Sequence, residues 1–305
     1  MSRYDIIIVG AGPAGLTAGL YAARGGLSTL VLDAGVPGGQ ITLTHRVENF
    51  PGLPEGIDGF ELGQLMERQA RRFGAELRQE NVTAVQFDGA ARRARTDAGA
   101  YQARALIVAS GAEHRKLGAP GEEQFTGRGV SYCATCDGAF FRDEDVAIVG
   151  GGDAAIDEGL FLARFASRVH VIHRRGELRA ARWLQERAFA EPKMSFVWNS
   201  VVEAIRGGGE VEALDLRNVV TKQASTLPVK GVFVYVGLVP NTMLVQGLLD
   251  LDETGHIIVT DRMETSVAGV YAAGDVRRNS GAQAITAAGD GATAAINAIK
   301  YLSEG

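Results

Sequence analysis

The chain has 305 residues, of which 46% are hydrophobic and 40 are glycine, and its formal net charge at pH 7 is −5. This length exceeds what one hydrophobic core usually organises, so we expect two domains with many tight turns and little disorder. The acidic balance, without a long lysine or arginine block, argues against a nucleic-acid partner or an anionic membrane surface.

Two features of the sequence indicate where the protein works. The apolar run at residues 6–9 is interrupted by Gly10, Gly12 and Pro13, so it is too short for the core of a signal peptide or for a membrane span. The two cysteines are too few for the disulfide framework of a secreted protein. We therefore expect a cytoplasmic protein with no membrane partner.

One short pattern occurs twice in the chain. The first copy reads Asp5-Ile-Ile-Ile-Val-Gly10-Ala-Gly12-Pro13-Ala14-Gly15, and the second reads Asp145-Val-Ala-Ile-Val-Gly150-Gly-Gly152-Asp153-Ala154-Ala155. Each copy predicts a strand, a glycine turn, a helix (residues 16–24 and 156–165) and a second strand (residues 28–32 and 168–172). Such a strand–helix–strand crossover predicts a parallel sheet.

The glycine turns predict two dinucleotide-binding sites. Glycine lets the backbone N–H groups at a helix start approach a pyrophosphate, whose negative charge the helix dipole favours. Ala155 replaces the third glycine in the second copy, which this fingerprint allows. One copy alone is a weak signal because glycine turns also occur for steric reasons, but two aligned copies are much stronger.

The residue that ends the second strand distinguishes the two sites. The first copy places Asp33 there, and a carboxylate accepts hydrogen bonds from ribose hydroxyls but repels a 2′-phosphate. The second copy places His173 there, followed by Arg174, Arg175 and Arg179, which would clamp a 2′-phosphate. We therefore expect NADP(H) at the second site, the alternative being a solvated basic strand end.

The rest of the chain completes an α/β architecture of two Rossmann-like domains. A glycine- and proline-rich loop (37–59) precedes an amphipathic helix (60–73) and a strand (105–109), and a linker (118–121) leads to the second unit. A strand at 231–236 ends that unit, and a strand at 269–273 with a helix at 284–302 returns to the first. The prediction is a first domain of residues 1–115 and 245–305, with residues 116–244 inserted as the second.

Cys133-Ala-Thr-Cys136 predicts a redox-active pair, since two cysteines at this spacing can close a small disulfide and a following helix lowers a thiol pKa. A zinc site with His170 and His173 is the main alternative, but residues three apart on a strand point to opposite faces. Two buried, unreactive thiols are a third interpretation, which the polar setting disfavours. Asp137 either handles protons or caps the helix.

A flavin is expected between NADPH and the cysteines, because a nicotinamide delivers hydride whereas thiolates open disulfides. The first site is therefore expected to hold FAD. A single dithiol must then meet both the flavin and an external protein disulfide. We expect one domain to move, with residues 118–121 and 237–241 absorbing the rotation.

With Cys133-Ala-Thr-Cys136-Asp137-Gly138 between two fingerprints, the whole chain resembles the low-molecular-weight thioredoxin reductases of bacteria. The resemblance implies that Cys136 faces the flavin, that Cys133 attacks the disulfide of thioredoxin or a thioredoxin-like protein, that Asp137 handles protons, and that the protein is a homodimer. It also implies that Asp275 holds the ribityl chain of FAD. The other FAD-site residues it implies are Gly38, Gly39, Gln40, Asn49, Val82, Ala109, Ser110, Gly111, Gly274, Gln283 and Ala284.

Three positions depart from the family pattern. Ser110 replaces the usual threonine but keeps a hydroxyl, Ala282 replaces an arginine near the flavin, and Leu238 replaces a histidine before the Pro-Asn pair. Ferredoxin–NADP reductases of this architecture lack the cysteines, and related dithiol oxidases generally lack the arginines. A flavin-binding redox sensor that signals without turnover remains an alternative.

Overall fold

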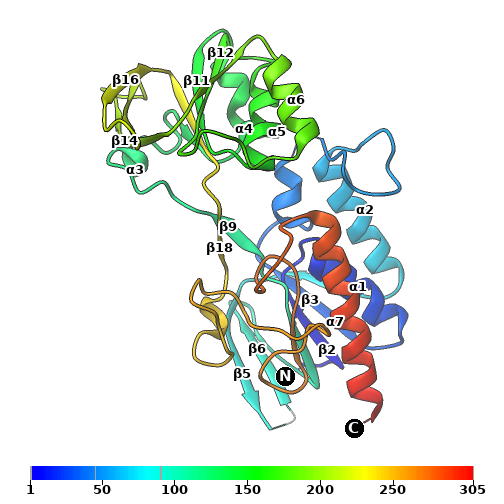
Figure 1. Cartoon of the computed structure of the whole chain (residues 1–305). Coiled ribbons are helices and arrows are strands. Elements are labelled where there is room, and N and C mark those ends of the chain that lie inside the picture. Colours follow the sequence, from blue (N-terminus) through cyan, green and yellow to red (C-terminus); the bar gives the residue numbers. More distant parts are fainter. Residues whose placement is uncertain (1, 45, 90, 305) are drawn as a thin grey trace. The chain divides into compact units, whose positions relative to one another are not determined.

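The chain divides into two units, which are described here from a computed structural model covering residues 2–44, 46–89 and 91–304 (Figure 1). Unit 1 comprises Met1–Glu113 and Val239–Gly305, and unit 2 comprises His114–Leu238. The predicted α/β fold, with one dinucleotide-binding unit inserted into another, is confirmed.

A five-stranded parallel sheet forms the centre of unit 1. Its strand order is β19-β8-β2-β3-β4. Every residue of β2 and β8 is buried, as expected for strands covered on both faces. The strands span Val270–Ala272 (β19), Ala105–Val108 (β8), Ile6–Val9 (β2), Thr29–Asp33 (β3) and Glu76–Gln79 (β4).

Helices cover one face of this sheet. α1 (Pro13–Arg24) and α7 (Ala284–Glu304) pack on the face that carries Ile6 and Ile8, and α2 (Gly59–Arg72) packs against α1. The two helices α1 and α7 approach so closely that a Cβ on Gly291 would lie 2.0 Å from the Ala14 carbonyl oxygen. Glycine is therefore required at this contact.

A second sheet covers the opposite face, with the order β1-β7-β6-β5. Its strands span Ser2–Arg3 (β1), Ala100–Ala103 (β7), Ala91–Thr96 (β6) and Val82–Asp88 (β5). Two short 3-10 helices, η1 (Gly39–Leu43) and η3 (Met243–Val245), complete unit 1. In the part of the chain that the structure describes, no helix is long and apolar enough to cross a bilayer.

Unit 2 repeats the three layers. Its parallel sheet has the order β10-β17-β11-β12-β13, with helices α5 and α6 on one face and the antiparallel sheet β14-β15-β16 on the other. The parallel strands are Val130–Ser131 (β10), Gly231–Val234 (β17), Asp145–Val149 (β11), Arg168–Ile172 (β12) and Met194–Val197 (β13). The other elements are Glu122–Phe125 (α3), Ala134–Asp137 (α4), Gly138–Phe141 (η2), Asp153–Leu162 (α5), Arg182–Ala190 (α6), Ser200–Arg206 (β14), Ala213–Asn218 (β15) and Ala224–Pro228 (β16).

The two crossings between the units run through a pair of short strands. β9 (Ala112–His114) and β18 (Leu238–Pro240) pair with each other. The segment after β9 is held by Glu122, whose carboxylate accepts hydrogen bonds from the Leu117 and Gly118 N–H groups at 2.6 Å each.

Most of the predicted elements are present, with small shifts at their ends. β12 has the predicted limits, whereas α5 starts three residues earlier than predicted and ends at Leu162. It starts earlier because the glycine turn itself provides the helix cap at Gly152. The loop predicted at 37–59 contains the 3-10 helix η1.

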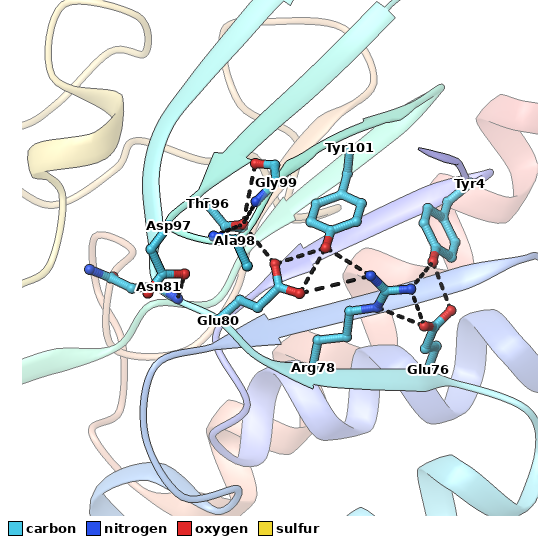
Figure 2. Close-up of polar contacts among 10 residues, drawn as sticks. All are labelled: Tyr4, Glu76, Arg78, Glu80, Asn81, Thr96, Asp97, Ala98, Gly99 and Tyr101. Carbon is cyan, nitrogen blue, oxygen red and sulfur yellow. Dashed lines mark hydrogen bonds and ion pairs between the residues drawn. The ribbon is translucent and has the colours of Figure 1, made fainter. Parts of the chain in front are cut away.

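A polar network in unit 1 joins the parallel sheet to the antiparallel sheet (Figure 2). Arg78 on β4 donates to Glu76 Oε1 at 2.7 Å and to Tyr101 Oη at 2.8 Å. Tyr101, on β7, donates to Glu80, which also accepts from Thr96 Oγ1 at 2.6 Å. The hydrogen bond from Thr96, assisted by Tyr101, lowers the pKa of Glu80 although burial opposes the shift.

Removing the Tyr101 hydroxyl should destabilise unit 1. Tyr101→Phe removes one hydrogen-bond partner from Arg78 and one from Glu80, so we expect a loss of about 1–2 kcal/mol at pH 7. The pKa of Glu80 is lower in the folded protein than in the unfolded chain, so its stabilising contribution is present above the unfolded pKa and is lost as the pH falls through the folded pKa. The difference in unfolding free energy between the variant and the wild type should therefore shrink as the pH falls below about 4. Urea unfolding at several pH values measures both effects.

Tyr21→Phe is the matched control for this prediction. Tyr21 is half-buried on α1, and its hydroxyl makes no hydrogen bond to any residue that the structure describes. Its removal should change the unfolding free energy by less than about 0.5 kcal/mol. Equal losses in the two variants would show that the network does not stabilise the unit.

Candidate functional site

The predicted residues of the first site gather at one edge of the unit 1 sheet. Gly10 follows β2, Asp33 ends β3, Ala109 follows β8 and Gly274 follows shortly after β19. These strands are parallel, so all four positions lie at their carboxyl ends. This is the edge where open α/β sheets bind ligands.

The glycine turn before α1 leaves room for a ligand but none for side chains. Gly10 has φ +109°, and a Cβ there would lie 2.2 Å from the Ala109 carbonyl oxygen. A Cβ on Gly15 would lie 1.8 Å from the Gly10 oxygen, whereas one on Gly12 would meet nothing within 4 Å. No side chain caps the start of α1, where Pro13 and Ala14 lie, so its N–H groups are available to an anion.

Asp33 is held in place by the turn it faces. Its carboxylate accepts hydrogen bonds from the Ala11 N–H at 2.5 Å and the Gly35 N–H at 2.7 Å. A pocket of about 160 Å³ opens beside it. Among the lining residues that the sequence analysis missed are the polar side chains of Glu67, Arg71, Arg78 and Gln79, which come from α2 and β4.

The turn after β19 is fixed by an ion pair that sequence reasoning also missed. Asp290 is buried on α7 and accepts from Arg277 Nε at 2.7 Å and from the Gly274 N–H at 3.1 Å. Asp275 accepts from Ser280 Oγ at 2.7 Å, and burial raises the pKa of its carboxyl group. Nothing about the spacing of Arg277 and Asp290 signalled this pair.

The remaining residues predicted for the first site lie in several environments. Asn49 Nδ2 donates to Gln283 Oε1 at 2.8 Å, immediately before α7 begins at Ala284. The Ser110 hydroxyl donates to the Asn241 carbonyl oxygen at 2.7 Å, and Gly111 adopts φ +66°. Gly38 and Gly39 both have positive φ and precede the exposed Gln40, while the Val82 side chain is packed in the core.

Unit 2 repeats the glycine turn at the carboxyl end of its own sheet. Gly150 follows β11 with φ +154°, and a Cβ there would lie 2.5 Å from the Tyr235 carbonyl oxygen. Gly152 is open, no side chain caps α5, and Asp153 Oδ1 accepts from the Ala181 N–H at 2.7 Å. Ala154 is exposed and Ala155 is buried, so the edge is again open to an anion.

The basic cluster stands beside this second turn. His173 is buried against Gly151, and the Arg179 N–H donates to the Gly151 carbonyl oxygen at 2.7 Å. Burial, together with the charges of the three arginines, lowers the pKa of His173, whose Nε2 is buried and has no hydrogen-bond partner among the described residues. Arg174, Arg175 and Arg179 are exposed, and no carboxylate pairs with them in residues 2–44, 46–89 and 91–304. This cluster fits a phosphate.

The two cysteines form a disulfide in unit 2. Cys133 is half-buried and caps the one-turn helix α4, where its Sγ accepts from the Cys136 N–H at 3.1 Å. Cys136 is exposed, and Asp137 ends α4 and precedes η2 without a capping hydrogen bond from its side chain to the described residues. His170 is bonded through Nδ1 to Ser195 Oγ at 2.8 Å.

Similar proteins are found along the whole chain. The family model "Pyridine nucleotide-disulphide oxidoreductase" matches residues 4–291. The thioredoxin reductase of Listeria innocua is 50% identical over 304 residues, covering 99% of this chain and 94% of the relative. That of Bacillus subtilis is 46% identical over 303 residues, covering 99% and 95%.

Solved structures agree. The thioredoxin reductase of Lactococcus lactis has a TM-score of 0.97 at 44% identity, covering 99% of each chain. That of T. acidophilum has a TM-score of 0.94 at 33% identity, covering 98% of this chain and 99% of the other. The resemblance seen in the sequence is confirmed: the chain belongs to the pyridine nucleotide-disulphide oxidoreductase family, among its thioredoxin reductases.

Proposed function

We propose that this chain is an NADPH-dependent thioredoxin reductase, which passes electrons through FAD and the Cys133–Cys136 pair to the disulfide of thioredoxin or a thioredoxin-like protein. The proposal rests on the disulfide of unit 2, which lies in the same unit as one glycine turn at a sheet edge. Unit 1 has a second such turn. Two nucleotides and one dithiol are the parts that a relay from hydride to disulfide needs.

FAD is assigned to unit 1 and NADPH to unit 2. In unit 1 the N–H groups at the start of α1 would bind the pyrophosphate, Asp33 would face the ribose, and Asp275 would face the ribityl chain. In unit 2 the start of α5 would bind the other pyrophosphate. The unpaired charges of Arg174, Arg175 and Arg179 support the choice of a phosphorylated nucleotide.

The dithiol chemistry follows from the residues around the pair. When bound, the flavin supplies two-electron chemistry: it can accept a hydride and give the electron pair to a disulfide. One thiolate of the reduced pair then attacks the substrate disulfide, forms a mixed disulfide with one substrate sulfur and releases the other as a thiolate. The second thiol of the pair attacks the enzyme sulfur of this mixed disulfide, which re-forms the Cys133–Cys136 bond and releases the reduced substrate. Cys133 is assigned the first attack, Cys136 the flavin-facing position, and Asp137 the transfer of protons.

We also infer the compartment, the oligomeric state and a domain motion. We infer that the protein works in the cytoplasm, because a cysteine pair that must cycle requires a reducing compartment. A homodimer is proposed from the family resemblance. Rotation about the connections at residues 118–121 and 237–241 is proposed because one dithiol must serve two reaction partners.

Serine at either cysteine should stop thioredoxin reduction. In Cys133→Ser and Cys136→Ser, NADPH should still bleach the flavin absorbance, because hydride transfer precedes the dithiol step. Stopped-flow absorbance follows the first step and continuous NADPH oxidation with thioredoxin follows turnover. Near-normal turnover in either variant would contradict the relay. A wild-type protein that is reduced once by NADPH and does not turn over with thioredoxin would instead be a redox sensor.

The arginines should decide which nucleotide is used. Arg174→Ala combined with Arg175→Ala should raise KM for NADPH about 10- to 100-fold and change KM for NADH little, since only NADPH carries the 2′-phosphate. The control is Arg206→Ala combined with Arg217→Ala, two arginines of unit 2 that already pair with Asp215 and Glu203. Equal losses for both nucleotides would remove the phosphate assignment.

A further inference from the structure

The two residues between the cysteines are held by side chains from two other elements of unit 2. The Ala134 N–H donates to Tyr235 Oη at 3.0 Å, and Tyr235 directly follows β17. The Thr135 side chain hydrogen-bonds the carboxyl group of Glu158, which lies on α5. The short ring closed by the disulfide is thus fixed to the body of the unit at two successive residues.

Glu158 is an unusual partner for this purpose. Its Oε2 is buried and has no hydrogen-bond partner in the described residues. A buried carboxyl oxygen without a partner is costly, so such a group calls for an explanation, and buried groups with shifted pKa values cluster at functional sites. The carboxyl group of Glu158 has no part in the nucleotide sites or in the thiol–disulfide exchange proposed above.

The surroundings of Glu158 favour its neutral form. Burial, followed by the negative charge of Asp157, raises its pKa to about 8, and the hydrogen bond from Thr135 opposes the shift. Tyr235 also interacts with Glu158, because burial and then the charge of Glu158 raise the pKa of Tyr235, with smaller effects from Asp137 and Asp157. No cation is among the groups that shift the pKa of Glu158.

Reduction of the disulfide changes the charge next to this carboxyl group. Two electrons break the sulfur–sulfur bond and leave two sulfurs, at least one of which is a thiolate near neutral pH when its pKa is low. A new negative charge near a buried carboxyl group makes ionisation of that carboxyl group harder. An ionised Glu158 would therefore take up a proton as the disulfide is reduced.

We propose that Glu158 is a positioning residue that holds Thr135 in the dithiol ring and couples reduction of the Cys133–Cys136 disulfide to uptake of a proton by its own carboxyl group. The electrons come from whichever donor reduces the pair, and the proton comes from solvent. The inference rests on the redox role of the cysteines proposed above, but it does not depend on the identity of the protein substrate.

The test is the pH dependence of the dithiol equilibrium in the flavin-loaded protein. The protein is equilibrated with reduced and oxidised dithiothreitol between pH 6 and pH 10, and its thiols are counted by alkylation and mass spectrometry. The slope of this equilibrium against pH gives the number of protons taken up per two electrons. Above about pH 8 this number should be larger in the wild type than in Glu158→Gln, by at most one proton, and below pH 7 it should be the same in both. Identical pH dependence throughout, with equal flavin content and melting temperature, would overturn the proposal.

Two further variants keep the test decisive if Glu158→Gln does not fold. Asp157→Asn removes a neighbouring negative charge, so the extra proton uptake should begin at a lower pH than in wild type. Thr135→Val removes the hydrogen bond that stabilises the carboxylate, so the uptake should begin at a higher pH. A merely structural role would move neither onset, and onsets that stay at the wild-type pH in both variants would contradict the coupling.

The same variants separate this proposal from the proposed function. Dithiothreitol replaces NADPH and thioredoxin in the equilibrium, so the proton count does not depend on turnover. A protein that never reduces thioredoxin but shows the extra proton refutes the function alone. A protein that turns over normally but lacks the extra proton refutes the coupling alone.

Discussion

The rest of the structure depends on a close approach between a glycine turn and the end of the neighbouring strand. A Cβ on Gly10 would lie 2.2 Å from the carbonyl oxygen of Ala109, and one on Gly150 would lie 2.5 Å from that of Tyr235. In both units the turn therefore packs backbone against backbone, and the helix that follows starts at the sheet edge with uncapped N–H groups. A charged phosphate is the natural partner of such an edge.

Because both units satisfy this constraint, their ligands are distinguished by a few side chains. The end of β3 carries Asp33, whose carboxylate is already bonded to the first turn. The buried His173 directly follows β12 and is itself followed by exposed arginines. The second unit also carries the disulfide, and the two residues within that ring are bonded to Tyr235 and Glu158. Tyr235 thus takes part in both the nucleotide edge and the dithiol.

The sequence allowed the parallel sheets and both turns to be predicted, because continuous apolar strands and glycine at fixed spacing are local signals. The antiparallel layers β5–β7 and β14–β16 were not predicted, since their strands mix buried and exposed positions irregularly. The Arg277–Asp290 pair and the contact of Glu158 with Thr135 were also missed. Each joins residues on different elements, and only the folded chain brings them together.

Two nucleotides and one dithiol are proposed to form a single electron path. The visible spectrum of the purified protein tests this path when it is recorded under anaerobic conditions during addition of NADPH and then of oxidised thioredoxin. We expect a flavin spectrum that NADPH bleaches and that excess oxidised thioredoxin restores. A protein without a flavin spectrum, or a bleached spectrum that thioredoxin leaves unchanged, would contradict it.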